Sequence, residues 1–409
     1  MLTPAPFSPD QSPDELVANA RALGEGKFAD RSARYDEDGS FPFDNYNDLR
    51  DAGFLALTIP RENGGLGADF ETYCRVSAEL GRWCGATALT FNMHAQTTLW
   101  TGAVFDSLPV RDETRALQNQ RREKLYEKVI KEGAIFAQPF SEPNSAAAAG
   151  KAPFGTTAKK VDGGWIVNGM KHFASLAGAA THYSMVCTVE GDEGPDKIRN
   201  AVYLCVPQDA DGFEIFGPWD PVGMRATVSR GLKLEDVFVP DDLELLPPGI
   251  YYRLALKWPH MFFTLSPTYL GLSQGAFDFT VKYLRGEIPT VPGKSRHIPA
   301  KQFAVSRMRL LLEQSRALFE CTIREAAFNP TKDQRLRAYA AQHTIMERAQ
   351  EICALGIRTC GGRSLLKNFP LERMYRESRC GSVMLPWTAE ITQQRLGEES
   401  LYEPGETDE

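Results

Sequence analysis

The pattern of apolar and polar positions changes twice along the chain of 409 residues. From residue 12 to about 132, apolar residues recur at helical spacing, and glycine-rich turns separate the helical segments. Ser12-Pro13-Asp14-Glu15 forms a capping box with proline at the first helical position, which predicts a helix running towards Arg34. Further helices are predicted over residues 46–51, 70–83, 86–105 and 112–131.

The middle of the chain, from about residue 134, has the alternation of β-strands. VDGGWIVNGMKHFAS (161–175) contains an Asp-Gly and an Asn-Gly pair among alternating apolar positions, which predicts a hairpin. Short strands are predicted to follow at 181–189, 199–207, 213–217 and 229–240. Such regularly spaced short strands are typical of a small β-barrel or sandwich.

Helical spacing returns after Pro247-Pro248. Three long amphipathic runs follow at 261–284, 300–327 and 332–359. A second capping box at 331–334 begins the last of these runs, and Gly361-Gly362 ends it. We therefore expect three domains, with boundaries at 1–132 (α), 133–247 (β) and 248–409 (α).

Composition and charge narrow the class of protein. Hydrophobic residues make up 43% of the chain and charged residues 24%, as in ordinary globular proteins. The net charge of -7 argues mildly against a nucleic-acid or anionic-membrane partner. Eight scattered cysteines show neither a C-x-x-C pair nor metal-ligand spacing, so we expect reduced thiols and no metal. No basic segment precedes an apolar run at the N-terminus, which predicts a cytoplasmic protein without membrane spans.

Four motifs, in the order α, β, α, resemble the acyl-CoA dehydrogenase superfamily of flavoproteins over roughly residues 45–397. They are FAQPFSEPN (136–144), WIVNGMKHFAS (165–175), GMRATVSRGLKLEDVFVP (223–240) and RTCGGRSLLKNFPLERMYRESR (358–379). The resemblance implies an α+β fold with a helical N-terminal domain, a central small β-barrel and a C-terminal four-helix bundle. It further implies flavin contacts from Phe140, Ser141, Phe173, Ala174 and Ser175.

The cofactor that the resemblance implies is FAD, bound across the interface of a homodimer or homotetramer. Gly361 and Gly362 would let backbone amides approach the pyrophosphate of an FAD held by the neighbouring subunit, and Arg358 would contribute to a basic wall around the diphosphate. Four further contacts are implied, at Arg296, Gln302, Thr388 and Glu390.

Each of these motifs also has a purely structural interpretation. Taken alone, Gly361-Gly362 is more often a helix C-cap, Phe173 is more often core, and Ser141 is more often a turn residue. The basic residues between 358 and 379 could in isolation indicate a polyanion surface. The order and placement of all the motifs favour the flavin site.

The catalytic base of the family is missing from both of its usual positions. In the family, a glutamate removes the α-proton of an acyl thioester while the flavin accepts a hydride from the β-carbon. The segment that usually carries it reads LPWT here, with Leu385 or Pro386 in the slot. The second known position, in WPHMFF, holds Met261.

We predict His94 as the catalytic base, because it is titratable and lies on a helix whose counterpart in the family lines the substrate cavity. His260 is a weaker candidate, and His172 is assigned a structural role. The predicted reaction is oxidation of an acyl thioester, of CoA or a carrier protein, with a flavoprotein or oxygen as electron acceptor. A flavin-dependent oxygenase or hydroxylase acting on another small organic substrate is the alternative. Arg379 and Met384, however, replace the histidines that oxygenase branches often carry.

Overall fold

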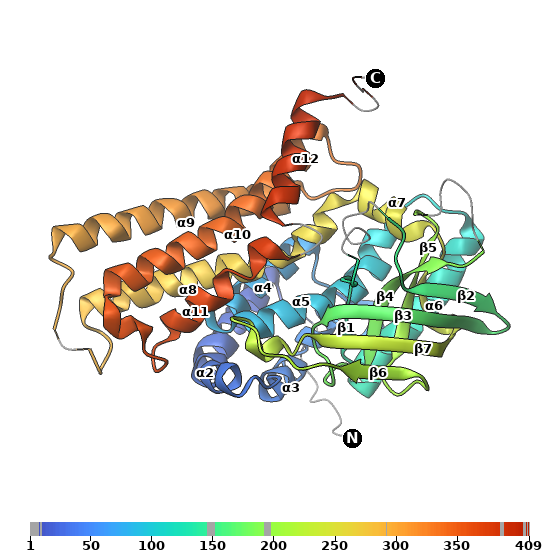
Figure 1. The fold of residues 1–409 in the computed structure, drawn as a ribbon, viewed down its shortest axis with the longest axis horizontal. Coiled ribbons are helices and arrows are strands. Elements are labelled where there is room, and N and C mark those ends of the chain that lie inside the picture. The colour runs from blue at the N-terminus through green and yellow to red at the C-terminus, as the bar shows by residue number, and fades with distance from the viewer. Residues whose placement is uncertain are drawn as a thin grey trace.

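Helices, then strands, then helices follow one another along the chain (Figure 1). The computed structural model describes residues 8, 10–144, 152–191, 198–291, 293–384, 388–403, 406 and 408. The strands form one end of an elongated molecule, and the long C-terminal helices extend to the other end. None of the helices in these ranges combines the length and apolar character that crossing a bilayer requires.

The N-terminal helices begin at the predicted capping box. The Ser12 hydroxyl accepts a hydrogen bond from the Glu15 backbone N–H, and the Glu15 carboxylate accepts one from the Ser12 backbone N–H. The helix predicted towards Arg34 consists of three segments, since a π-helical turn joins two α-helices. The helices of this block are α1 (Pro13–Leu23), α2 (Ala29–Asp38), α3 (Phe43–Asp51), α4 (Phe70–Trp83), α5 (Gly85–Leu99) and α6 (Asp112–Glu132).

The helix predicted over 86–105 changes its winding before it ends. Regular α-helix stops at Leu99, and a π-helical turn, Trp100–Val104, follows. Gly102 has a non-helical backbone within this turn, with φ -99° and ψ -110°. A Cβ atom at Gly102 would lie 2.5 Å from the hydroxyl of Tyr126 on α6. A larger residue at Gly102 would therefore displace the Tyr126 side chain.

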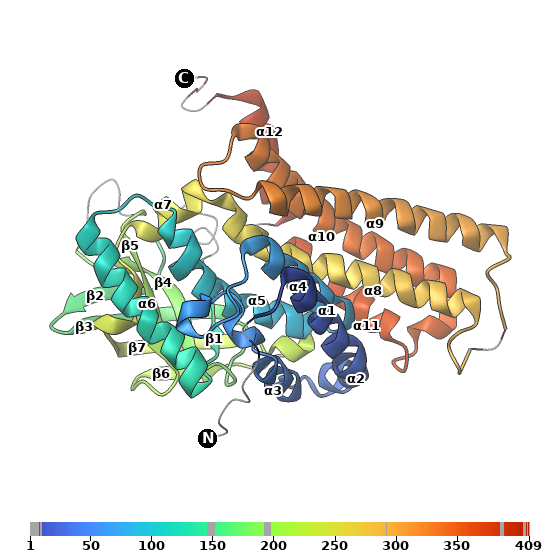
Figure 2. The same cartoon turned by 180° about the vertical axis from the view of Figure 1, so that it is seen from behind.

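The strands form one mixed sheet, with the order β6-β7-β3-β2-β4-β5-β8 and β1 paired in parallel with β4. In the described part of the chain, no ladder joins the end strands β6 and β8, so the predicted barrel closure is not confirmed. Helix α6 crosses one face of the sheet (Figure 2). The bounds are β1 (Phe136–Ala137), β2 (Thr157–Val161), β3 (Gly164–Ala174), β4 (His182–Val189), β5 (Ala201–Pro207), β6 (Phe213–Phe216), β7 (Arg230–Pro240) and β8 (Glu244–Leu246).

The two Gly-containing pairs of the predicted hairpin have different roles. Asp162-Gly163 forms the turn between β2 and β3, as predicted. Asn168-Gly169 lies inside β3, where the pairing with β7 shifts register, so only the first pair forms the hairpin turn. The Asn168 side chain exchanges two hydrogen bonds with Asp236 of β7, at 3.0 and 2.8 Å. These bonds occupy the polar groups that the irregular pairing leaves open.

The C-terminal block is built on three long helices that lie side by side (Figures 1 and 2). The capping box at Thr331 is confirmed, and Gly361 ends α10. Helices α11 and α12 are short, and the predicted four-helix bundle is not confirmed. The elements are α7 (Ile250–Lys257), a 3-10 segment (Pro259–Leu265), α8 (Ser266–Arg285), α9 (Pro299–Glu325), α10 (Lys332–Cys360), α11 (Pro370–Ser378) and α12 (Ala389–Leu401).

Helices α4 and α8 meet backbone to backbone. A Cβ atom added at Gly271 would lie 2.2 Å from the carbonyl oxygen of Ala78, and one at Gly275 would lie 2.4 Å from that of Arg82. From the other side, a Cβ atom at Gly81 would lie 2.6 Å from the carbonyl oxygen of Thr268. These glycines form a joint, which we call the α4–α8 glycine joint, that fixes the N-terminal helices on the C-terminal block.

Candidate active site

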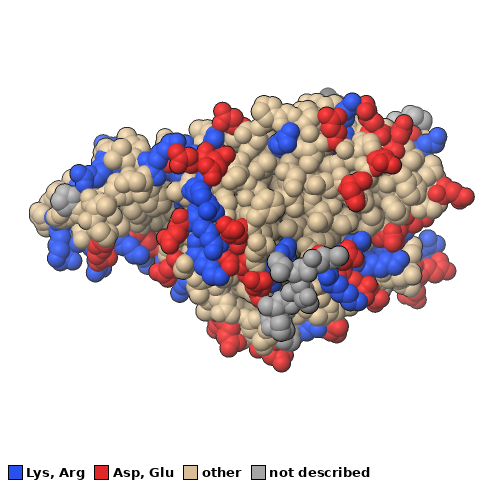
Figure 3. Space-filling model, turned by 90° about the horizontal axis from the view of Figure 1, so that it is seen from below, with Lys and Arg blue, Asp and Glu red and all other residues tan. Residues whose placement is uncertain are grey.

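A pocket of about 400 Å³ lies where the sheet meets the helices. Two faces with different chemistry line it, one from the strands and their loops and one from helical segments. Seen from below, the surface between the helical block and the sheet carries few charged side chains over a wide area (Figure 3). The lining residues used below are Leu89, Met93, Gln96, Trp100, Phe140, Ser141, Glu142, Phe173, Ser175, Trp219, Met224, Thr227, Ser229, Met261, Thr264, Leu265, Cys380 and Met384.

The strand-side wall presents a row of hydroxyl groups. The hydroxyls of Ser175 and Ser229 lie 2.8 Å apart, and those of Ser229 and Thr227 lie 2.7 Å apart. Ser141 adds a further hydroxyl to the same wall. A polar planar group lying on this wall would find donors and acceptors along one edge.

The backbone of the strand-side wall is strained. Phe173 has φ 52° and Met224 has φ 54°, and both side chains line the pocket. Val228, which is β-branched, has φ 46°. Such left-handed conformations of non-glycine residues cost free energy and are found most often at functional sites.

Phe173 stands out on this wall because its side chain is 69% exposed. Trp219 contacts it edge to face, with ring centroids 6.3 Å apart. The strained backbone at Phe173 holds an aromatic ring exposed to the pocket, and a planar ring system bound there could pack against it. The strand-side wall therefore fits an isoalloxazine ring.

The helical wall is apolar. Leu89 and Met93 come from α5, Met261 and Leu265 from the 3-10 segment before α8, and Met384 from the segment after α11. Its polar side chains satisfy each other in part, because the Gln96 amide donates a hydrogen bond to the Thr264 hydroxyl. This wall suits an uncharged, apolar part of a substrate.

A buried ion pair supports the strand-side wall. The Lys171 ammonium lies 2.6 Å from the Glu142 carboxylate, which also accepts hydrogen bonds from the N–H groups of Gly155 and Thr156. Lys171 also donates to the Val186 carbonyl. Burial alone would raise the pKa of Glu142, but Lys171 and the N–H donors lower it overall. Glu142 is therefore a paired carboxylate and not a free base.

Cys380 is the other ionisable side chain among the described lining residues. Burial, together with the nearby Glu377 carboxyl, raises the pKa of Cys380 to about 11. The slot predicted at Leu385 and Pro386 lies outside the described residues, and neither side chain can accept a proton. The described lining residues thus offer no free general base. No cluster of three or more His, Cys, Asp or Glu in the described ranges is arranged to hold a metal.

The structure does not give His94 the role of a base in this pocket. Its Nε2 lies 2.7 Å from the Leu55 carbonyl oxygen, and its Nδ1 accepts a hydrogen bond from the Phe136 N–H at 3.1 Å. Neutral imidazole has one donor and one acceptor, so both are used. The ring is fully buried, is not among the pocket lining residues, and has a pKa lowered to about 4 by burial. His94 instead ties α5 to the loop at Leu55 and to β1.

His260 and His172, the other two histidines considered in the sequence analysis, also lie outside the lining. His260 precedes Met261, but its ring is fully buried, and burial lowers its pKa to about 4. Neither ring nitrogen of His260 has a hydrogen-bond partner among the described residues. His172 donates its backbone N–H to the Ser141 carbonyl at 2.8 Å, which agrees with the structural role expected for it.

The predicted cofactor contacts fall into three groups in space. Phe140, Ser141, Phe173 and Ser175 all line the pocket. Ala174 does not, because it is the fully buried last residue of β3. The structure thus brings together four of the five contacts predicted on the strand side.

The second group lies at the far end of the helical block. Gly361 and Gly362 follow the end of α10, opposite the sheet (Figure 1). Arg363 donates to the Thr290 carbonyl at 2.9 Å, which joins this loop to the segment that leads into α9. Three further residues of the group lie on these elements, namely Arg296, Gln302 and Arg358. Within one chain, this group is separated from the pocket by the length of the helices.

The third group begins α12. The Thr388 hydroxyl accepts a hydrogen bond from the Ile391 N–H as an N-cap. Glu390 is exposed in the first turn of α12, and neither residue lines the pocket. Their assignment as FAD contacts stays a prediction.

Several residues of the site were not assigned from the sequence. Lys171 lies inside a quoted motif, and a lysine flanked by strand residues was a usable signal for a buried partner of Glu142. Trp219 and Met224 reach the pocket from the segment that joins β6 to β7. Met224 lies inside the quoted motif 223–240, whereas no local pattern marks Trp219.

Comparison with known families gives the same order of domains. The acyl-CoA dehydrogenase N-terminal domain matches residues 10–104, the middle domain matches 137–237, and the C-terminal domain matches 263–383. YdbM of Bacillus subtilis (strain 168), which carries a provisional acyl-CoA dehydrogenase name, is 29% identical over 365 residues. The match covers 87% of this chain and 89% of YdbM.

Solved structures share the fold at lower identity. Butyryl-CoA dehydrogenase from Megasphaera elsdenii superposes with a TM-score of 0.79 and 19% identity, covering 95% of this chain and 98% of its own. The dibenzothiophene monooxygenase TdsC from Paenibacillus sp. A11-2 superposes with a TM-score of 0.78 and 19% identity. That match covers 94% of this chain and 96% of TdsC. The same fold thus occurs in a dehydrogenase and in an oxygenase.

Proposed function

Because the chain belongs to the acyl-CoA dehydrogenase superfamily, it is a flavin-dependent oxidoreductase, and we propose that it oxidises an acyl thioester of CoA or a carrier protein. FAD is the cofactor that the family implies, and when bound it supplies the hydride acceptor. A second flavoprotein or oxygen would take up the electrons.

The observation that carries this proposal is the pairing of two unlike walls in one pocket. Phe173 and the hydroxyls of Ser141 and Ser175 would hold the flavin ring against the strand side. The methionine-rich helical wall would hold the acyl part at the opposite face and exclude water from it. Fixing two reactants face to face supplies much of the rate enhancement of such reactions.

Removal of the α-proton is the step for which the described lining residues offer no free group. Glu142 is held by Lys171, and Cys380 keeps its proton at neutral pH. This observation favours a second candidate, a flavin-dependent oxygenase or hydroxylase acting on a small apolar substrate, since that chemistry need not begin at an α-carbon.

We propose a homodimer or homotetramer as the working assembly. Two apolar side chains of α9, Phe303 and Leu310, are 78% and 62% exposed and lie seven residues apart, so they share one face. Leu365 and Leu366, beside the Gly361 loop, are also exposed. A second copy that covered these residues would remove apolar surface from water and bring the loop near another subunit's pocket.

Anaerobic mixing of the FAD-loaded protein with a panel of acyl-CoA thioesters tests the reaction. We expect loss of the flavin's visible absorbance without oxygen for at least one thioester. If no thioester reduces the flavin, while a flavin reductase and an apolar aromatic compound together drive oxygen consumption, the oxygenase replaces the dehydrogenase. Protein that fails to bind any flavin would contradict both candidates.

A further inference from the structure

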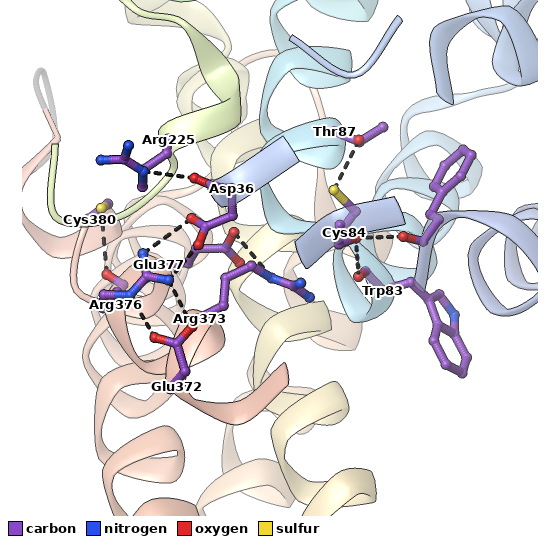
Figure 4. Close-up of polar contacts among 12 residues, drawn as sticks. Asp36, Trp83, Cys84, Thr87, Arg225, Glu372, Arg373, Arg376, Glu377 and Cys380 are labelled. Carbon is purple, nitrogen blue, oxygen red and sulfur yellow. Dashed lines mark hydrogen bonds and ion pairs between the residues drawn. The ribbon is translucent and has the colours of Figure 1, made fainter. Parts of the chain in front are cut away.

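A cluster of charged side chains lies beside the pocket, where the N-terminal helices, the β6–β7 segment and α11 meet. Figure 4 shows Asp36 of α2 between Arg225 of the β6–β7 segment and Arg376 of α11. The Asp36 side chain is 9% exposed and that of Arg376 is 21% exposed. The cluster thus joins three parts of the chain that are distant in sequence.

Every N–H group of the Arg376 guanidinium has a partner. Its Nη1 donates to Asp36 Oδ1 at 3.1 Å and to the Val222 carbonyl at 3.0 Å, and its Nη2 donates to Asp36 Oδ2 at 2.5 Å. The remaining N–H groups, on Nη2 and Nε, donate to Glu372 at 3.0 and 2.9 Å. Arginine has five such donors, and lysine has three in a different geometry, so only arginine can make this set.

Asp36 acts on both sides of the cluster. Its carboxylate accepts two hydrogen bonds from Arg376, and its backbone carbonyl accepts one from Arg225 Nε at 2.7 Å. Arg225 also donates to the Asp220 carboxylate and to the Pro221 carbonyl. Residues 220–225 are therefore held from α2 and from α11 at once.

The segment that these arginines hold is the strained part of the pocket wall. Met224 and Val228, on either side of the short 3-10 turn Arg225–Thr227, both have left-handed backbones. The chain also lies directly on α11, because a Cβ atom at Gly223 would be 2.4 Å from the Arg376 carbonyl oxygen. Strain of this kind persists only where surrounding contacts enforce it.

The charge state of Arg376 is secure. Burial opposes its charge, but the hydrogen bonds with Glu372 and Asp36 outweigh burial and raise its pKa. Arg376 therefore keeps its proton and all five of its donors.

We propose that Arg376 is a positioning residue for the reaction. By joining Asp36, Glu372 and the Val222 carbonyl, it fixes residues 222–229 and with them the flavin-facing Met224, Thr227 and Ser229. Arg376 itself is not among the residues that line the pocket. The effect on catalysis rests on the proposed flavin function, whereas the effect on the loop does not.

Arg376→Lys is the direct test, because it keeps the charge and loses the five-donor fork. In the FAD-free protein, hydrogen–deuterium exchange of peptides covering 222–229 should become about tenfold faster, the scale of one lost hydrogen bond to a charged group. In the FAD-loaded protein, FAD should dissociate more readily and the visible spectrum of the flavin should shift. Arg335→Lys is the matched control, because Arg335 pairs with Glu399 of α12 at 2.7 Å with a similarly covered side chain.

Two further variants keep the test decisive. Arg225→Lys removes the bond to the Asp36 carbonyl from the opposite side and should loosen the same peptides, so it carries the test if Arg376→Lys does not fold. Asp36→Asn keeps its backbone carbonyl and changes only the carboxylate, so it should loosen the same peptides less than Arg376→Lys does, because Arg376 retains Glu372 and the Val222 carbonyl. If both lysine variants lower the melting temperature but leave exchange of 222–229 and the flavin spectrum unchanged, Arg376 only stabilises the fold. If the wild-type protein binds no flavin, but Arg376→Lys still speeds exchange of 222–229, the proposed function is overturned and the role of Arg376 in holding this segment is kept.

Discussion

The two walls of the pocket differ in how they are held. The strand-side wall consists of loops with left-handed residues, and a buried ion pair and the Arg376 cluster enforce its shape. The helical wall combines α5 with a 3-10 segment and the segment after α11, is lined mainly by methionine and leucine, and includes the hydrogen-bonded pair Gln96 and Thr264. The wall that presents hydrogen-bonding groups to one cofactor must hold those groups in fixed positions. The wall that contacts an apolar substrate needs only a complementary shape, which flexible methionine side chains can provide.

Breaking the ion pair behind the strand-side wall should have the largest effect. Lys171→Met leaves the Glu142 carboxylate buried without its cation, so we expect a loss of about 3–5 kcal/mol in the free energy of unfolding. Denaturant unfolding of the two proteins measures this loss. The double variant Glu142→Gln with Lys171→Met should recover most of it. Equal stability of wild type and single variant would mean that the pair does not support this wall.

The next effect concerns Glu377, which lies behind the junction of the two walls. Burial raises the pKa of Glu377 to about 7, from an ordinary value of 4.5, although Arg373 lies 3.7 Å away. Between these values the unfolded chain loses a proton that the folded chain retains, so the stability contribution falls as pH rises from about 4.5 to about 7.

Glu377→Gln removes this titration. The variant should match the wild type near pH 4.5 and exceed it above pH 7 by up to about 3 kcal/mol. Urea unfolding of both proteins across this pH range gives the difference. A difference that is constant with pH would show that Glu377 ionises normally in the folded chain.

Adding a base to the helical wall sharpens the contrast further. Met261→Glu places a carboxylate on that wall, at the second position where the family carries its base. If the substrate is an acyl thioester, flavin reduction should accelerate by about 10²-fold, the lower range for a general base. Met261→Gln, which has similar size and no charge, is the control. Equal rates for the two variants would argue that proton removal does not limit the reaction.

The smallest effect is expected at His94, on the face of α5 turned away from the pocket. His94→Gln can replace one of its two hydrogen bonds, so we expect a loss of about 1–2 kcal/mol in unfolding free energy and an unchanged rate of flavin reduction. Thermal unfolding and stopped-flow reduction measure the two quantities. A rate that falls about 10²-fold with FAD still bound would restore the catalytic role predicted from the sequence.

Local patterns in the sequence predicted most of the elements. The capping boxes at Ser12 and Thr331 and the bounds of α4 follow from side chains within a few residues of each other, and the structure agrees. The sequence does not show the irregular pairing at Asn168-Gly169, because the partner of Asn168, Asp236, lies 68 residues away.

The site could be predicted only where a motif covered it. Ser141, Phe173 and Ser175 lie in motifs and line the pocket as expected. His94 was chosen as a base because it lies on α5, but the sequence does not show which face of α5 a residue occupies when nearly all of its residues are buried. The cluster around Arg376 joins residues about 340 positions apart, and patterns of sequence spacing predict contacts only between residues close in the chain.

The α4–α8 glycine joint has a consequence for how enzymes on this scaffold could diversify. Because Gly81, Gly271 and Gly275 let the two backbones touch, the helices have no layer of side chains between them that could thin or thicken. Neither α4 nor α8 contributes a residue to the described pocket lining, so the joint fixes the framework around the pocket and not its walls. Substitutions along the methionine-rich wall could therefore reshape the pocket for a new substrate without disturbing the joint.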